Sequence, residues 1–336
     1  NMHIKGPLTN KSFGAIVHDV NVLQITTSEK TQLYNAYIKY GVLIFPNQGH
    51  LTHDEQEKFA REFLGHLDIP QLHISNIKKK GTLLNPSASK REKIQILTQR
   101  GNEGWHMDNT YKPLSAKAGF LRAEIVPNCT EKAMGQRGET AFCDCRAAYQ
   151  ALPEDMKEKC KSLSAYHAGL VSQARFGEYT GGGVYDKTQV YLRPIVKFHP
   201  DTGMPNLQIG RHAFGAMYTD TKTGKRTSLA PNESDEILDY LLKFATTSNN
   251  KWIYYHDYNV GDLVLWDNRR MLHRACPYPL TEPRVMHGNR VAGDPITEKA
   301  LDVPVDVTAH ILTSELERIA KNPEIKEREM AARARI

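Results

Sequence analysis

The chain of 336 residues contains few cysteines and no long apolar run. Its five cysteines are an odd, widely spaced set, which does not suit a framework of disulfide bonds. No apolar stretch approaches the roughly 18 residues that a membrane-spanning helix needs, and the first residues lack the apolar segment of a signal peptide. We therefore expect a reduced, cytoplasmic protein with no membrane partner.

A strong excess of charge of one sign is also lacking. The 44 Lys and Arg residues outnumber the 38 Asp and Glu residues, which gives a formal net charge of +6. Apart from residues 78–80 the basic residues are scattered and are not interleaved with aromatics, which argues against a nucleic-acid partner. This charge balance is compatible with a small anionic substrate. The composition leaves the oligomeric state open, and a homo-oligomer is compatible with it.

Short β-rich runs dominate the sequence, and turn signals bound most of them. The predicted strands cover residues 13–17, 42–45, 94–98, 119–126, 191–198, 252–255, 263–266 and 284–291. Helical spacing is less frequent, and it predicts helices over residues 27–40, 53–63, 144–152, 154–163 and 232–244. We expect a mainly β (α+β) fold in which peripheral helices pack outside a β-sandwich or barrel core.

No repeat or low-complexity linker divides the chain, so residues 1–336 are predicted to form a single domain with a core over about 13–294. Two polar segments, 75–93 and 178–187, are predicted loops of unusual length, which are either solvated insertions or lids over an active site. The charged tail over 308–336 is predicted to be a surface helix.

The pattern His-x-Asp occurs three times, and it can present two metal ligands on one side of a strand because residues i and i+2 point the same way. With 14 histidines, roughly one occurrence is expected by chance. Proline interrupts His199-Pro200-Asp201, which favours a turn, and His66-Leu67-Asp68 follows a helix and precedes Pro70. His106-Met107-Asp108 leads toward the strand at 119 and is the best placed of the three.

A second signal lies near the other end of the chain. Residues 263–273 read as a strand, a tight turn and a second strand that ends in His273, and Arg284 follows 11 residues later. Two imidazoles and a carboxylate form the facial triad of non-haem Fe(II) oxygenases, and a nearby guanidinium can bind a carboxylate in bidentate fashion. Taken singly, His273 would more often be a histidine of the core, and Arg284 would more often form a surface ion pair. Their spacing together favours a site that binds a metal and a carboxylate.

With these motifs the chain resembles the taurine dioxygenase-like (TauD/TfdA) family of Fe(II)- and 2-oxoglutarate-dependent dioxygenases over about residues 13–294. The resemblance rests on 104–108, 138–140 with 147–149, 193–194 with 199–203, and most strongly on Trp266-Asp267-Asn268-Arg269, His273 and 284–287.

The resemblance implies a double-stranded β-helix core of the jelly-roll or cupin type. It implies that His106, Asp108 and His273 bind Fe(II), and that Thr140 and Arg284 hold the far carboxylate of 2-oxoglutarate. Members of the family use O₂ and 2-oxoglutarate to oxidise an unactivated C–H bond and release succinate and CO₂, so no catalytic residue is expected beyond the metal centre. The carboxylate of Asp108 disfavours halogenation, since related halogenases have a small residue there.

The sequence departs from the family at the positions that bind taurine. Gly288 stands where an arginine would bind the sulfonate, and 69–72 lacks the expected His-Pro-x-Tyr element, so taurine is not the expected substrate. Asn102 matches a polar substrate contact. Arg290 lies an even number of residues from Arg284 and is expected to bind an anionic group on the same strand face, with an exposed strand-end arginine as the equal alternative. Arg211-His212 is a further candidate to line the cavity that would hold the substrate.

We expect a small, carboxylate-bearing substrate and hydroxylation as the outcome. Oxidative cyclisation or desaturation of an amino-acid-derived substrate, as in kainoid-type biosynthesis, is the alternative within the family. The alternative from another class is a non-catalytic β-sandwich protein that binds an acid without iron. A metal-dependent hydrolase is disfavoured because no general base such as that of His-Glu-x-x-His accompanies the ligands. His167, His256 and His287 are expected to be structural, and the buried-thiol interpretation is preferred for Cys143-x-Cys145.

Overall fold

A computed structural model of the chain describes residues 2–79, 81–177, 188–247 and 251–334. The loop predicted over 178–187 lies outside these residues. The described residues divide into two compact units. Unit 1 contains residues up to Glu103, Ala116–Asp144 and the segment that ends at Gly293, and unit 2 contains Gly104–Ser115, the segment from Cys145 and the segment from Asp294. Each unit is described by itself, and the single-domain expectation stays a prediction.

Unit 1 is built on two β-sheets. The larger has seven strands in the order β1, β2, β3, β14, β5, β16, β4, and every neighbouring pair except β2–β3 is antiparallel. Its strands are β1 (His3–Lys5), β2 (Ala15–His18), β3 (Val42–Phe45), β4 (Leu67–Ser75), β5 (Ala118–Ile125), β14 (Leu263–Asp267) and β16 (Val285–Val291). The smaller sheet has the order β13 (Ile253–His256), β6 (Thr140–Asp144), β15 (Met271–Ala275).

Strand β14 shows why the two sheets face each other. Leu263 and Leu265 point toward the helices of unit 1, whereas Val264 and Trp266 belong to a second apolar cluster. That cluster includes Phe142 of the smaller sheet, so side chains of period two cover both faces of the larger one. The facing sheets and outer helices confirm the predicted mainly β fold with a double-stranded β-helix core.

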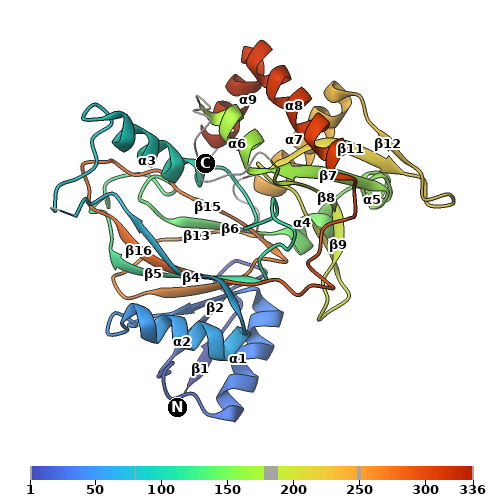
Figure 1. Cartoon of the computed structure of the whole chain (residues 1–336). Helices are drawn as coiled ribbons and strands as arrows, with labels where there is room; N and C mark the ends of the chain where they lie inside the picture. The colour runs from blue at the N-terminus through green and yellow to red at the C-terminus, as the bar shows by residue number, and fades with distance from the viewer. Residues whose placement is uncertain (1, 80, 178–187, 248–250, 335–336) are drawn as a thin grey trace. The chain divides into compact units, whose positions relative to one another are not determined.

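Helices α1 (Thr27–Tyr40) and α2 (His53–Leu64) cover the outer face of the larger sheet (Figure 1). Each begins with a capping box, in which Thr26 pairs with Glu29 and Thr52 pairs with Glu55. These caps satisfy backbone N–H groups at the first turn, which is why the helices begin where the sequence predicts.

The strand predicted over residues 94–98 is wrong, because these residues lie in helix α3 (Lys90–Gly101). The alternation of Ile94 and Ile96 resembles a strand, but Ser89 caps the helix by accepting the backbone N–H of Glu92 at 3.2 Å. The candidate loop 75–93 therefore ends inside the first turn of α3.

Strand β4 was missed because Pro70 interrupts it. The structure places β4 at the edge of the seven-stranded sheet, where a residue without an N–H is tolerated.

Unit 2 contains a four-stranded sheet and a two-stranded hairpin. The four-stranded order is β12 (Arg226–Ser228), β11 (Ala213–Thr219), β7 (Leu163–Ala168), β8 (Val190–Pro194), and the hairpin joins β9 (Val196–Phe198) to β10 (Pro205–Leu207). The strand predicted over 191–198 is thus two strands. The helices are α4 (Cys145–Ala151), α5 (Glu154–Lys161), α6 (Gly169–Phe176), α7 (Pro231–Thr246), α8 (Val305–Lys321) and α9 (Pro323–Ala334).

The tail predicted as one surface helix forms α8 and α9, which are separated at Asn322 before Pro323. Leu312, Ile319 and Ile325 are buried in the cluster that also contains Tyr166 of β7. In Figure 1 these helices lie beside α6. Among the described residues, no helix has the length and apolar character needed to cross a membrane.

His167 lies on β7 of the four-stranded sheet, and its side chain is buried. It lies opposite Ala213 on β11 and Tyr191 on β8, and neither of its ring nitrogens has a hydrogen-bond partner among the described residues. Burial, together with the charge of Arg193, lowers the pKa of His167 to about 3. The ring is therefore neutral in the folded protein, in agreement with a structural role.

We predict that Gly119→Ala destabilises the protein. A Cβ atom at Gly119 would lie 2.2 Å from the Trp266 ring, so the indole must shift, at a cost of about 1–3 kcal/mol. Gly177→Ala is the matched control, since a Cβ there meets no atom of the described residues within 4 Å and the backbone φ is −161°. Urea unfolding of both variants measures the difference, and equal midpoints would contradict the packing described for Trp266.

A second prediction concerns acid stability. The unfolded chain binds a proton at His167 below pH 6.5, whereas the folded chain does not until about pH 3, so stability is lost as the pH falls through this range. Lowering the pH from 6.5 to 5 should cost the wild type about 2 kcal/mol more than His167→Gln, as measured by urea unfolding at both pH values. The same pH dependence in both proteins would show that His167 is protonated when folded.

Candidate metal centre and 2-oxoglutarate pocket

His106 and Asp108 lie together in unit 2. They are not part of any strand, so the alternation expected for a strand does not explain their placement; the chain turns after Asp108, where Asn109 has a φ of 59°. His106 is buried, and its Nε2 lies 3.7 Å from Oδ1 of Asp108.

The other ring nitrogen of His106 fixes the tautomer. Nδ1 lies 2.7 Å from the carbonyl oxygen of Gly104, and because a carbonyl only accepts, Nδ1 carries the proton. The lone pair is then on Nε2, the atom that faces Asp108. A histidine oriented in this way by a backbone carbonyl is typical of metal ligands.

Buried Arg193 on β8 supports the segment that follows. Its guanidinium donates to the backbone carbonyls of Thr110 at 2.6 Å, Lys112 at 2.6 Å and Glu298 at 3.0 Å. These backbone carbonyls satisfy the N–H groups of the guanidinium, and burial lowers the pKa of Arg193 to about 10. The residue therefore serves to hold the loop that carries the candidate ligands.

His212 and Arg211 lie next to the segment of unit 2 that carries His106 and Asp108. The ring of His212 lies 6.0 Å from that of His106, and its Nδ1 lies 3.1 Å from Oγ of Ser172. Burial, followed by the charge of Arg211, holds the pKa of His212 well below its usual value. The backbone N–H of Arg211 donates to the Trp105 carbonyl at 2.8 Å, so both residues are tied to this loop.

His273 lies on β15 in unit 1, buried beside two aromatic rings. Its ring centroid is 4.8 Å from that of Trp266 and 6.4 Å from that of Phe142. These ring contacts restrict the orientation of the imidazole. Asn102 ends α3, and its carbonyl accepts the N–H of Ala275 at 2.8 Å, which places it beside the same strand.

The turn between β14 and β15 is held by two buried ion pairs. Arg269 donates to both carboxylate oxygens of Asp267 at 2.9 Å, and Arg270 donates to Asp144 on β6 through Nε at 2.8 Å and through Nη2 at 2.5 Å. Paired, hydrogen-bonded charges are the form in which ions are tolerated in a core. The Asp-Asn-Arg-Arg turn therefore sets the register in which His273 enters β15.

Thr140, Tyr258 and Arg284 form a second polar group in unit 1. Oγ1 of Thr140 lies 3.0 Å from the hydroxyl of Tyr258, whose pKa is raised to about 12 by burial. The charges of both Arg284 and Arg290 act on this hydroxyl. Thr140 and Arg284 are thus brought to the same place, as the resemblance implies.

Arg284 is fixed by its backbone as well as by its side chain. Its N–H donates to Oδ1 of Asn76 at 2.8 Å, and its Nε donates to the Gly138 carbonyl at 3.1 Å. A Cβ at Gly138 would lie 3.2 Å from Cδ of Arg284, and Gly138 has a φ of 78°. The glycine of the Gly-Glu-Thr motif therefore allows the arginine to pass close to the backbone.

Arg290 is buried on β16 and is not an exposed strand-end residue. Its guanidinium lies 4.9 Å over the Trp266 ring and donates to the Asn289 carbonyl at 3.1 Å. Its role as a substrate anchor stays a prediction. At Gly288, a Cβ would lie 2.9 Å from the Phe120 carbonyl oxygen, which leaves little space for the arginine found in taurine enzymes.

The donors suit the groups that the resemblance implies. Two buried imidazoles and one carboxylate are the ligand types preferred by Fe(II), and a hydroxyl with a guanidinium suits a carboxylate. Sequence reasoning missed Tyr258 and Asn76, because neither lies in a recognisable motif. The remaining His-x-Asp patterns behave as expected: His199 begins the turn of the β9–β10 hairpin, and Asp68 lies in edge strand β4.

Comparison with known proteins gives a consistent result. The profile of the family described as "Taurine catabolism dioxygenase TauD, TfdA family" matches residues 5–291. An (S)-phenoxypropionate/alpha-ketoglutarate-dioxygenase of Sphingobium herbicidovorans is 40% identical over 298 residues, which cover 86% of this chain and 95% of that protein. An alpha-ketoglutarate-dependent 2,4-dichlorophenoxyacetate dioxygenase of Cupriavidus pinatubonensis is 29% identical over 288 residues, covering 81% of this chain and 92% of that protein.

A solved structure is similar as well. The crystal structure of AAD-2 in complex with Mn(II) and N-oxalylglycine superposes with a TM-score of 0.74 and 29% identity, over 90% of this chain and 100% of that one.

Tyr258→Phe tests the pocket around Thr140 and Arg284. Loss of the hydroxyl that Thr140 contacts should weaken binding of a carboxylate there by about 1 kcal/mol, or roughly fivefold in the KM for 2-oxoglutarate, with kcat little changed. Tyr254→Phe is the control, because its hydroxyl contacts His256. Succinate formation at varied 2-oxoglutarate measures both, and an unchanged KM in Tyr258→Phe would remove Tyr258 from the pocket.

Proposed function

The chain belongs to the TauD, TfdA family, and on this basis we propose that it hydroxylates a small aryloxyalkanoate-type carboxylic acid. It is an oxidoreductase of the 2-oxoglutarate-dependent dioxygenase class and uses Fe(II), 2-oxoglutarate and O₂. This membership sets aside the non-catalytic acid-binding alternative.

The proposed metal ligands are His106, Asp108 and His273. Support comes from the fixed tautomer of His106, the burial of both imidazoles and the donor types. When bound, Fe(II) with 2-oxoglutarate and O₂ supplies the oxidising power for the C–H bond. The protein's part is to orient these ligands and to keep the surroundings dry.

The proposed site for the far carboxylate of 2-oxoglutarate is formed by Thr140 and Arg284, with Tyr258 orienting the threonine hydroxyl. The described partners of the Arg284 guanidinium are a backbone carbonyl and the Tyr278 ring, 5.6 Å away, and neither is a carboxylate. A charge-assisted hydrogen bond to a carboxylate is stronger than a neutral one, which favours this end of the co-substrate.

The names of the relatives support the substrate class. Phenoxypropionate and 2,4-dichlorophenoxyacetate both carry an aryl ether and a carboxylate on one carbon. Hydroxylation of that carbon would give a hemiketal or hemiacetal, which collapses to a phenol and a 2-oxo acid. In the overall balance, one O₂ and one 2-oxoglutarate are consumed, and succinate and CO₂ are formed. These names favour hydroxylation over kainoid-type cyclisation or desaturation, which are the alternative outcomes within the family.

Arg211 is the proposed anchor for the substrate carboxylate. A Cβ at Gly104 would lie 2.9 Å from Cδ of Arg211 and 3.0 Å from Nη2 of Arg333. Both arginine side chains therefore pass close to Gly104, which precedes His106 by two residues. Arg290, the anchor expected from the strand pattern, is the second candidate, and its contact with Trp266 fits a wall of the cavity equally well. Asn102 remains a proposed polar contact.

Two measurements test the metal centre and the substrate class. Anaerobic Fe(II) with 2-oxoglutarate should give a visible charge-transfer band that His106→Ala abolishes. Aryloxyalkanoates should stimulate succinate release, whereas their methyl esters should not. Absence of the band, or no succinate with any carboxylate or sulfonate tested, would overturn the proposal.

Variants separate the two candidate anchors. Arg211→Met should raise the KM for the acid by about tenfold or more, the cost of losing a charged hydrogen bond, and leave the KM for 2-oxoglutarate unchanged. Arg290→Met is the matched comparison. If only Arg290→Met raises the KM for the acid, Arg290 is the anchor and Arg211 is not.

A further inference from the structure

A second group of metal-ligating side chains lies in unit 1, on the face of the seven-stranded sheet that carries α2. His53 is the first residue of α2, Glu124 lies on β5, and His287 lies on β16. His73 of β4 is the register partner of His287, so its side chain is on the same face. Four separate elements thus contribute to one cluster, and the function proposed above uses none of these side chains.

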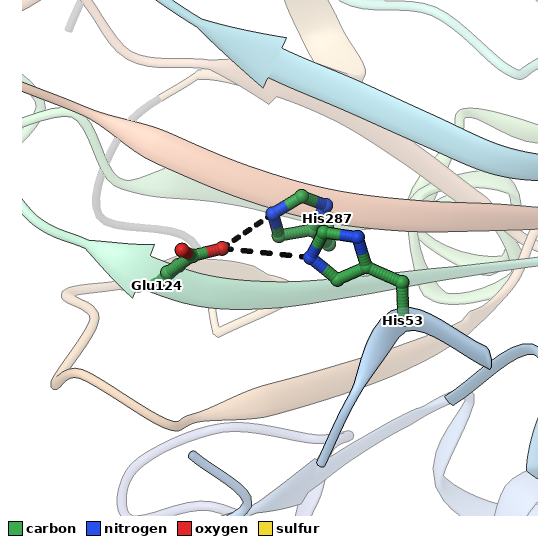
Figure 2. Close-up of side chains that lie close together, drawn as sticks. All are labelled: His53, Glu124 and His287. Carbon is green, nitrogen blue, oxygen red and sulfur yellow. Dashed lines mark ion pairs between the residues drawn. The ribbon is translucent and has the colours of Figure 1, made fainter. Parts of the chain in front are cut away.

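The geometry of the three central residues is that of converging ligands. Figure 2 shows Nε2 of His53 and Nε2 of His287 directed at the same carboxylate oxygen of Glu124. The His53 contact is 3.6 Å, and the candidate ligand atoms all lie within 4.8 Å of one another. Zinc binds such atoms at about 2.0–2.2 Å, so small rotations of the two exposed side chains, His53 and Glu124, would close the ligands around one ion.

The imidazole rings of this cluster lie close together. The rings of His53 and His287 have centroids 3.4 Å apart with their planes tilted by 33°, and the ring of His73 lies 4.8 Å from that of His287. Three imidazoles this close to one another can direct their nitrogen lone pairs at one divalent ion.

The charged residues around the cluster are compatible with the binding of a divalent cation. Arg122 is also close to Glu124, but its Nε is directed at Oε1 of Gln56, 2.9 Å away. Gln71, two residues from His73 on β4, donates to the carboxylates of Asp54 and Glu57, so acidic groups flank the cluster on the other side.

We propose that His53, Glu124 and His287 form a second metal site for a borderline divalent cation such as Zn²⁺, with His73 placed to serve as a fourth ligand. Imidazole and carboxylate ligands of this kind suit Zn²⁺, and partial exposure allows exchange with solvent. A bound ion would join α2 to three strands of the sheet, so its effect would be to stabilise the folded chain.

Zn²⁺ itself is the probe, used with the full-length chain without a histidine tag. Equilibrium dialysis followed by metal analysis should give about two Zn²⁺ per chain, since the ligands proposed for iron also bind zinc. His53→Ala and Glu124→Gln should each reduce this to about one, and so should His106→Ala, which acts on the other site. His50→Ala is the matched control, because His50 is an exposed histidine just before α2 and outside the cluster.

Thermal unfolding separates the two sites further. In the His106→Ala background, Zn²⁺ should still raise the melting temperature by a few degrees, and adding His53→Ala should remove the rise. Succinate formation by His53→Ala with saturating Fe(II) should equal that of the wild type. A single Zn²⁺ in the wild type that His106→Ala removes, or a second ion that both His53→Ala and Glu124→Gln retain, would overturn the second site without affecting the function proposed above.

Discussion

The indole of Trp266 is the contact on which most of unit 1 depends. It is buried between the two sheets, against Gly119 of β5 and near Phe142 of β6. The ring of His273 lies 4.8 Å from it, and the guanidinium of Arg290 lies 4.9 Å over it. A large aromatic ring buries much surface and accepts both ring and cation neighbours. One residue therefore sets how closely β14 approaches β5, how a proposed iron ligand is oriented, and where a buried cation is held.

Buried arginines have different partners in the β14–β15 turn and in the proposed 2-oxoglutarate pocket. Arg269 and Arg270 are paired with aspartates, which neutralises them and makes the turn before His273 rigid. Arg284 instead donates to a backbone carbonyl and lies beside an aromatic ring. A carbonyl satisfies an N–H without cancelling the charge, so positive potential remains where a dicarboxylate is proposed to bind. The same residue type thus stabilises the fold in one place and prepares a ligand site in another.

The two proposed metal sites use the same donor types in different surroundings. The imidazoles proposed for iron are buried, and the one at residue 106 has its tautomer fixed by a carbonyl. In the second cluster His53 and Glu124 are exposed, and only His287 is buried. Burial protects a reactive centre from water, whereas exposure suits an ion that exchanges and acts on stability. The first site is therefore suited to the proposed oxidation chemistry, and the second to a structural role.

Local patterns in the sequence determined much of this protein: the short β-rich runs that form β3, β5, β14 and β16, the capping boxes of α1 and α2, and the turn that proline imposes after His199. Each depends on residues a few positions apart. The alternating isoleucines of α3 misled the prediction because capping and packing outweigh a short pattern. Tyr258 beside Thr140, and His53 beside Glu124 and His287, were decided only by the tertiary structure. Strand order and register bring such distant residues together, and neither can be predicted from the spacing of residues within a single segment.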